Sequence, residues 1–169
     1  KGPFVATMKG VLHARFSGAT VIDLTHEIVV HWPAEAGFWL ERSYRYFPSG
    51  TVHLAVVDPG VGTGREIIVV EHDGHLFVAP DNGLLTPMVE TSSNAKVVRL
   101  DDGGLKRLGV KDPSATFHGR DIFAPLAAAL AAGEMDLGDV GPEHTGLIPS
   151  WAEPASKTPN GIEGLVITG

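Results

Sequence analysis

An apolar, β-branched run that ends in a glycine-rich loop constrains the fold of this chain more than any other segment. Residues 51–57 read TVHLAVV, a composition typical of a buried strand. The loop that follows, Asp58 to Arg65, reads DPGVGTGR and carries a carboxylate and a guanidinium. Because α/β proteins usually hold their chemistry where loops leave the carboxyl ends of strands, this pattern predicts an α/β fold with a functional loop at residues 58–65.

The rest of the chain alternates between helical and strand patterns. Helices are expected at residues 4–16, 33–47, 84–89 and 119–132, and further strands at residues 21–24, 66–71, 76–79 and 95–100. Asp73-Gly74 lies between two of these strands and is a two-residue turn signal, so it predicts a β-hairpin. We therefore expect an α/β domain with a largely parallel central sheet flanked by helices.

Composition excludes several classes of partner. The chain has 169 residues, 43% of them hydrophobic, which is enough for one substantial core. Its formal net charge is -7 and its 13 basic residues are scattered, so we expect no nucleic-acid partner. No apolar run approaches the roughly 20 residues that cross a bilayer, so we expect no membrane segment. The absence of cysteine excludes disulfides and thiolate metal sites, and favours a cytoplasmic protein.

Asp58 and Arg65 are the first candidate functional residues. The glycines between them permit positive φ angles and a close approach of the backbone to a ligand. The alternative is a surface ion pair on a loop, which contributes less than about 1 kcal/mol to stability. The loop has neither the Lys-Ser/Thr ending of a P-loop nor GxGxxG spacing, so no standard nucleotide motif is present.

A second cluster, TFHGRD at residues 116–121, stands where a loop turns into an alanine-rich helix. His118 could donate a hydrogen bond to a substrate oxygen or act as a base, and the alternative is a capping or core histidine. Arg120 and Asp121 are predicted to form a structural pair at the helix start.

Four other positions admit two interpretations. Trp32 could stack on a base or simply pack, and Asn82 belongs to a segment, Asp81 to Gly83, that is typical of a turn. His26 and His31 raise the question of a metal site, but no HExxH or comparable spacing occurs, so no metal is expected.

Five motifs in the same order resemble the S-adenosyl-L-methionine hydroxide adenosyltransferases, a family related to the fluorinase and chlorinase. The motifs are MKGVL (8–12), VIDLTHEI (21–28), FPSGTVHLAVVDPGVGTGRE (47–66), FVAPDNGLLT (77–86) and TFHGRDIFAPLAAALAAG (116–133). The resemblance implies cleavage of S-adenosyl-L-methionine by water or hydroxide at the 5′ carbon, giving adenosine and L-methionine. It also implies a homotrimer with the site at a subunit interface, and no metal or redox cofactor.

The resemblance assigns roles to particular residues. The family's catalytic set falls on Asp58, Arg65 and His118. The residues that it implies for substrate binding are Trp32, Phe117, Gly119 and Asn82.

The resemblance also implies a division into domains. Residues 1–145 correspond to an α/β N-terminal catalytic domain, residues 146–161 to a linker, and residues 162–169 to the first strand of a C-terminal β-barrel domain that is cut off.

Two alternatives to hydrolysis stay open. The first is a halogenase that acts on the same substrate with halide, although such enzymes carry a tyrosine where Asp58 stands. The second is a catalytically silent binding or oligomerisation module. It is suggested by Gly2, which stands in place of a family acid, and by the absence of the family's first TDFG-type strand before Lys1.

Overall fold

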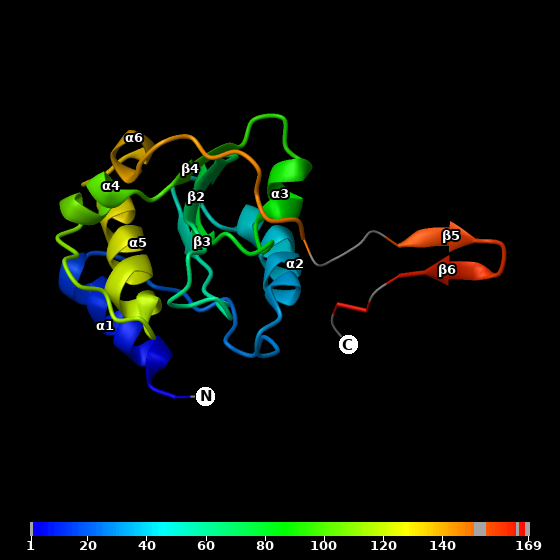
Figure 1. Cartoon of the computed structure of the whole chain (residues 1–169), viewed down its shortest axis with the longest axis horizontal. Coiled ribbons are helices and arrows are strands. Elements are labelled where there is room, and N and C mark those ends of the chain that lie inside the picture. The colour runs from blue at the N-terminus through cyan, green and yellow to red at the C-terminus, as the bar shows by residue number, and fades with distance from the viewer. Residues whose placement is uncertain (1, 151–154, 165, 168–169) are drawn as a thin grey trace.

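The computed structural model describes residues 2–150, 155–164 and 166–167, and Figure 1 shows their arrangement. The helices are α1 (Phe4–Arg15), α2 (Pro33–Ser43), α3 (Thr86–Glu90), α4 (Asp102–Arg107), α5 (Ala124–Ala131) and α6 (Leu137–Val140), with a 3-10 turn η1 (Tyr44–Tyr46) and a π-helical turn η2 (Gly119–Phe123). The strands are β1 (Val52–Leu54), β2 (Ile67–His72), β3 (His75–Pro80), β4 (Lys96–Arg99), β5 (Ser156–Thr158) and β6 (Gly161–Glu163).

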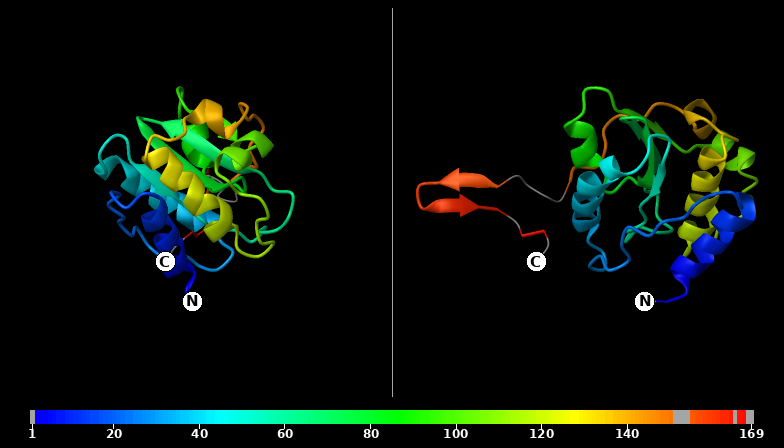
Figure 2. Two further views of the ribbon diagram at one scale, coloured as in Figure 1. Left: turned by 90° about the vertical axis from the view of Figure 1, so that its left-hand side faces the viewer. Right: turned by 180° about the vertical axis from the view of Figure 1, so that it is seen from behind.

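A four-stranded mixed sheet forms the middle layer of an α/β fold (Figures 1 and 2). Its strand order is β1-β3-β2-β4; β1 and β3 are parallel, whereas β2 is antiparallel to both of its neighbours. The expectation of a largely parallel sheet is therefore not confirmed. The physical reason is the predicted hairpin: Asp73 and Gly74 take φ angles of 50° and 76° and fold β3 back on β2. One reversed strand in the middle of the sheet thus makes two of its three pairings antiparallel.

Each face of the sheet packs against its own helices, which explains the consecutive apolar residues in β2 (Ile67 to Val70) and β3 (Leu76 to Pro80). Ile67 and Val69 of β2 point to the face covered by α1 and α5, and Ile68 and Val70 point to the face covered by α2 and α3. The approach of α2 is close: a Cβ on Gly37 would lie 2.3 Å from the Leu84 carbonyl oxygen. A glycine at this position lets the helix lie against the backbone of the segment that follows β3.

The predicted buried strand at residues 21–24 is wrong. This segment belongs to no strand of the structure, and Val21, Ile22 and Leu24 are 44–65% exposed. β-branched residues favour extended backbone, but a strand also needs a hydrogen-bonded neighbour. The segment instead lies beside the cavity described below.

The sequence patterns missed two short helices, α4 and α6. Both are stabilised at their N-termini by aspartates: Asp101 accepts a hydrogen bond from the Gly104 amide, and Asp136 forms a capping box with Asp139. These caps were the available signal, because helices of six and four residues are too short to show helical periodicity.

The C-terminal region contains an antiparallel pair, β5 and β6, which projects from the α/β body (Figures 1 and 2). Strand β5 falls within residues 146–161, the predicted linker, and β6 overlaps the strand predicted at 162–169. Residues 151–154 of that linker and residues 165, 168 and 169 of that strand lie outside the described residues. No closed barrel occurs in the part of the chain that the structure describes, so the predicted domain division stays a prediction.

None of the helices in the described ranges is both long and apolar enough to cross a membrane.

A buried histidine pair lies where β1 and β3 meet. His53 and His75 are 8% and 5% exposed, and His53 Nε2 lies 3.2 Å from His75 Nδ1. The His53 ring stacks on Phe77, and Tyr44 contacts both imidazoles edge-on. Burial, and then the neighbouring His75, lower the pKa of His53 from 6.5 to about 4.

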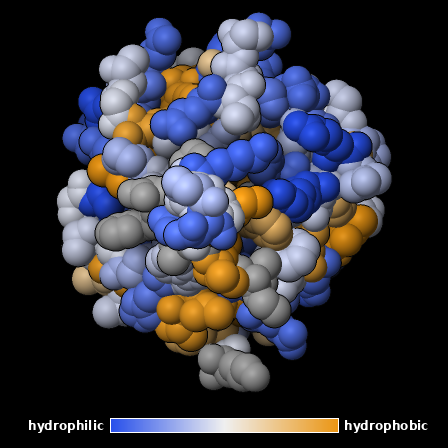
Figure 3. Space-filling view, turned by 90° about the vertical axis from the view of Figure 1, so that its right-hand side faces the viewer, coloured by the Kyte–Doolittle hydropathy of each residue, from blue (hydrophilic) through white to orange (hydrophobic). Residues whose placement is uncertain are grey.

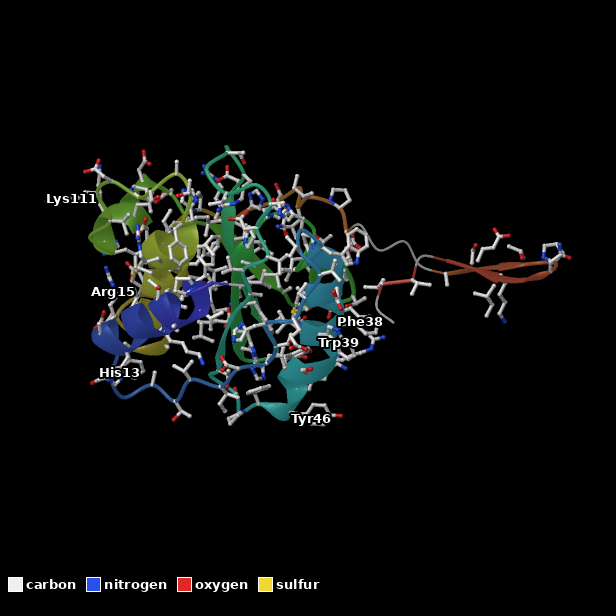
Figure 4. The ribbon with its side chains drawn as sticks, turned by 90° about the horizontal axis from the view of Figure 1, so that it is seen from below. His13, Arg15, Phe38, Trp39, Tyr46 and Lys111 are labelled. Carbon is white, nitrogen blue, oxygen red and sulfur yellow. The ribbon has the colours of Figure 1, made fainter. Side chains whose placement is uncertain are left out.

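This shift predicts a loss of stability in acid. Because the unfolded state takes up a proton at His53 near pH 6.5 and the folded state only near pH 4, the free energy of unfolding should fall by roughly 2–3 kcal/mol as the pH drops through this window. Urea denaturation at a series of pH values measures the slope. His53→Gln should flatten it, whereas the matched change His13→Gln, at an exposed residue of α1 (Figure 4), should not. An unchanged slope in His53→Gln would contradict the assignment.

Candidate active site

The glycine-rich loop 58–65 is shaped by contact with the loop that leads to His118. Gly62 has a φ of 78°, and a Cβ there would lie 2.2 Å from the Ala115 carbonyl oxygen. Any side chain would separate the two loops. Glycine is therefore required for the contact that brings residues from both loops together.

Asp58 and Arg65 form a buried ion pair at the two ends of this loop. Their side chains are only 6% and 9% exposed. Arg65 Nε donates to Asp58 Oδ1 at 2.9 Å, and Arg65 Nη2 donates to Asp58 Oδ2. The alternative of a surface ion pair is therefore wrong. A buried pair of this kind tolerates little misalignment, because both ions have lost their hydration and depend on each other for hydrogen bonds.

His118 joins the pair and completes a three-residue cluster. Arg65 Nη2 lies 3.0 Å from His118 Nδ1. Because a guanidinium can only donate, Nδ1 must be the acceptor, so the imidazole is neutral and carries its proton on Nε2. Burial, and then the positive charge of Arg65, lower the pKa of His118, while Asp58 and Asp121 oppose the shift. Near neutral pH, His118 is thus a neutral imidazole whose Nε2–H is able to donate a hydrogen bond.

Arg120 and Asp121 form the predicted structural pair. The guanidinium of Arg120 donates to both carboxylate oxygens of Asp121, at 2.5 and 2.8 Å. Asp121 Oδ2 also accepts a hydrogen bond from the Ser114 amide. Asp121 therefore ties the 114–118 loop to the start of η2, which helps to position His118.

A cavity of about 930 Å³ opens beside the cluster. Its wall includes Asp58 and His118 as well as Phe117 and Gly119. A Cβ on Gly119 would lie 2.9 Å from Met8 Sδ, so glycine lets α1 approach η2 here. The volume falls in the range of pockets that bind small molecules.

Two of the predicted substrate-binding residues, Trp32 and Asn82, do not share the position of Phe117 and Gly119 in the cavity lining. Neither is among the described residues that line the cavity. Trp32 Nε1 donates to the Ile167 carbonyl at 3.3 Å, and Asn82 Nδ2 donates to the Val57 carbonyl at 2.8 Å. Their contact with substrate stays a prediction.

Sequence reasoning missed a second polar network in the lining of the cavity. Asp23 lies 2.5 Å from Lys9 Nζ and 2.9 Å from His26 Nε2, and all three residues line the cavity. The bonds to Lys9, and then to His26, lower the pKa of Asp23. Lys9 and Asp23 are 14 positions apart and share no motif spacing, so only the fold could reveal the network. His26, which raised the question of a metal, is thus bonded to a carboxylate, and no cluster of three potential metal ligands occurs within the described ranges.

A family model and two similar curated proteins point to the same family. A family model described as the SAM hydroxide adenosyltransferase N-terminal domain matches residues 1–141. A protein of Salinispora tropica named (R)-S-adenosyl-L-methionine hydrolase is 45% identical over 140 residues, which are 82% of this chain and 52% of that protein. A protein of the same name from Thermus thermophilus is 38% identical over 170 residues, covering 98% of this chain and 65% of that protein. The chain thus spans about half to two thirds of the length of these relatives.

A solved structure shares the fold. The crystal structure of an uncharacterized conserved protein from Thermotoga maritima has a TM-score of 0.83 and 38% sequence identity, over 92% of this chain and 59% of that one.

The charge of Arg65 should contribute, after burial, to the low pKa of His118. In Arg65→Gln the pKa of His118 should rise part of the way to its ordinary value, because the repulsion is gone while burial remains. Arg65→Lys keeps the charge and should keep the pKa low. An NMR titration of the imidazole Hε1 signals, with His118 assigned by His118→Gln, measures the effect. Arg42→Gln, at an exposed residue of α2, is the control; an equal pKa in wild type and Arg65→Gln would show that burial alone sets it.

Proposed function

The chain belongs to the SAM hydroxide adenosyltransferase family, and on this premise we propose that it cleaves S-adenosyl-L-methionine with water. The oxygen of water attacks the 5′ carbon of the adenosyl group. The bond from that carbon to sulfur breaks, and its electron pair stays on sulfur, which becomes the neutral thioether of methionine. One proton of the water remains on the 5′ hydroxyl of adenosine and the other is released, so atoms and charge balance.

The observation that carries the proposal is the buried cluster of Asp58, Arg65 and His118, of which Asp58 and His118 line the cavity. The sulfonium is already a good leaving group, so the task of the protein is to hold a partly desolvated oxygen nucleophile in line with the 5′ carbon. Asp58 accepts a proton from the water. His118 stabilises the developing hydroxide through Nε2–H, and Arg65 holds both partners in place.

The same geometry favours water over halide as the nucleophile. A carboxylate at the cavity wall, Asp58, can accept a hydrogen bond and then a proton from water. Fluoride or chloride has no proton to give, so the carboxylate would only repel it. The names of the two relatives, both hydrolases, also support hydrolysis.

The adenosyl group is proposed to bind against Phe117 and Gly119, which line the cavity beside His118. Trp32 follows a residue that lines the cavity, His31, and is proposed to cover the base. Asn82 is proposed to act near this pocket, a role that its bond to Val57, next to Asp58, supports. The proposed reaction needs no metal or redox cofactor, because its leaving group is already activated.

The active assembly is proposed to be a cytoplasmic homotrimer with the site at a subunit interface. Val29 and Val30 line the cavity yet are 61% and 76% exposed, which is unfavourable unless another surface covers them. Apolar residues also appear on the face from which β5 and β6 project (Figure 3). We further propose that residues 1–145 form the catalytic domain, 146–161 the linker and 162–169 the first strand of a β-barrel domain. The family match to residues 1–141 supports the first boundary.

The direct test is product analysis in labelled water. We expect the protein, incubated with S-adenosyl-L-methionine in H₂¹⁸O, to give equimolar methionine and adenosine with one ¹⁸O on its 5′ oxygen. Liquid chromatography with mass detection measures both products. Halide competition under the same conditions should give no 5′-halogenated adenosine. Unchanged substrate, with binding shown by calorimetry, would support the silent-module alternative instead.

Asp58→Asn should separate binding from chemistry. The amide keeps the shape of the side chain but is a poor proton acceptor, so product formation should fall by about 10²- to 10⁴-fold. The affinity for substrate, measured by calorimetry, should change much less. Asp102→Asn, at an exposed residue of α4, is the matched control and should retain full activity. Activity close to wild type in a folded Asp58→Asn variant would rule out the assignment of the base.

A further inference from the structure

The dipeptide Asp81-Asn82 contacts both stems of the glycine-rich loop, that is, Val57 before the loop and Glu66 after it. The Asn82 side chain donates to the carbonyl of Val57, the residue before Asp58, at 2.8 Å. The Asp81 amide donates to the carbonyl of Glu66, the residue after Arg65, at 3.0 Å. One dipeptide therefore spans the two points where the loop leaves and rejoins the sheet.

The position of these stems matters because the ion pair joins the ends of the loop. Asp58 and Arg65 each lie one residue from a carbonyl that the dipeptide holds. Two parallel donor–acceptor contacts between these side chains require their backbones to sit at a fixed separation. Outside the loop, the bonds from Asp81 and Asn82 are well placed to set that separation.

The dipeptide is itself anchored from the other side by a buried carboxylate. The Asp81 side chain is 5% exposed; it accepts from His144 Nε2 at 3.0 Å and from the Ile148 amide at 3.0 Å. Gly83, next in the chain, has a φ of 87°, and a Cβ there would lie 2.6 Å from the Pro149 carbonyl oxygen. The turn after β3 is thus fixed against residues 144–149, and cannot shift without breaking these contacts.

We infer that Asn82 is a positioning residue that, held by Asp81, sets the geometry of Asp58 relative to Arg65. It acts through the backbone of Val57 and does not contact the substrate, in keeping with its absence from the described lining of the cavity. The family resemblance instead implies that Asn82 contacts the substrate. The catalytic part of the inference rests on the proposed function, whereas the loop geometry can be tested without it.

Two variants of Asn82 test the inference. Asn82→Asp replaces the Nδ2 donor by an oxygen that repels the Val57 carbonyl. Asn82→Ser adds no charge but shortens the side chain, so that it no longer reaches the Val57 carbonyl. Asn94→Asp makes the same chemical change at an exposed site between α3 and β4 and is the control. All are compared with wild type as the full chain.

The first readout is hydrogen exchange of peptides covering residues 57–66, without substrate. Both Asn82 variants should exchange there about tenfold faster, as expected for the loss of one hydrogen bond of about 1.4 kcal/mol, and Asn94→Asp should not. Equal exchange in wild type and both variants would overturn the inference, whatever the outcome for turnover.

The second readout is turnover of S-adenosyl-L-methionine. Misplacement of Asp58 should lower kcat by about 10- to 100-fold with little change in KM. A raised KM with unchanged kcat would mean that Asn82 binds substrate, and would overturn the inference. If wild type itself gives no product, the proposed function fails, and the exchange experiment alone decides whether Asn82 positions the loop.

Discussion

The buried ion pair between Asp58 and Arg65 is the interaction on which the site depends. Two charges removed from water are tolerated only when they satisfy each other, so the loop between them must bring its ends to a fixed separation. The glycine at position 62 lets this loop pack against the 114–118 loop, which carries His118 into contact with Arg65. The geometry of the candidate site and the folding of the two loops therefore depend on each other.

The strand order of the sheet brings the two ends of the glycine-rich loop together. Strand β1 leads into the loop and β2 leads out of it, and both flank β3. The end of β3 therefore lies between the two stems, where Asp81 and Asn82 can hold both. Because β2 runs antiparallel to β3, and β1 runs parallel to β3, the start of β2 lies at the same edge of the sheet as the end of β1. Arg65, just before β2, therefore lies close to Asp58, and the hairpin that makes the sheet mixed also positions the ion pair.

Local signals in the sequence predicted much of the fold, and the failures share a cause. The turn at Asp73-Gly74, the helix at the N-terminus and the Arg120–Asp121 pair were predictable because short-range geometry decides them. The largely parallel sheet and the strand at residues 21–24 were not, because strand direction and pairing depend on distant neighbours. The cluster of Asp58, Arg65 and His118 was anticipated in its members, but its burial and the neutral state of His118 required the fold.

The proposed reaction takes place beside Asp58 and His118. A crystal structure of the protein with adenosine and methionine bound tests it most directly. We expect the 5′ oxygen of adenosine to lie within hydrogen-bond distance of Asp58 and of His118 Nε2, with the methionine sulfur on the far side of the 5′ carbon. Adenosine bound elsewhere, or with its 5′ oxygen directed away from both side chains, would contradict it.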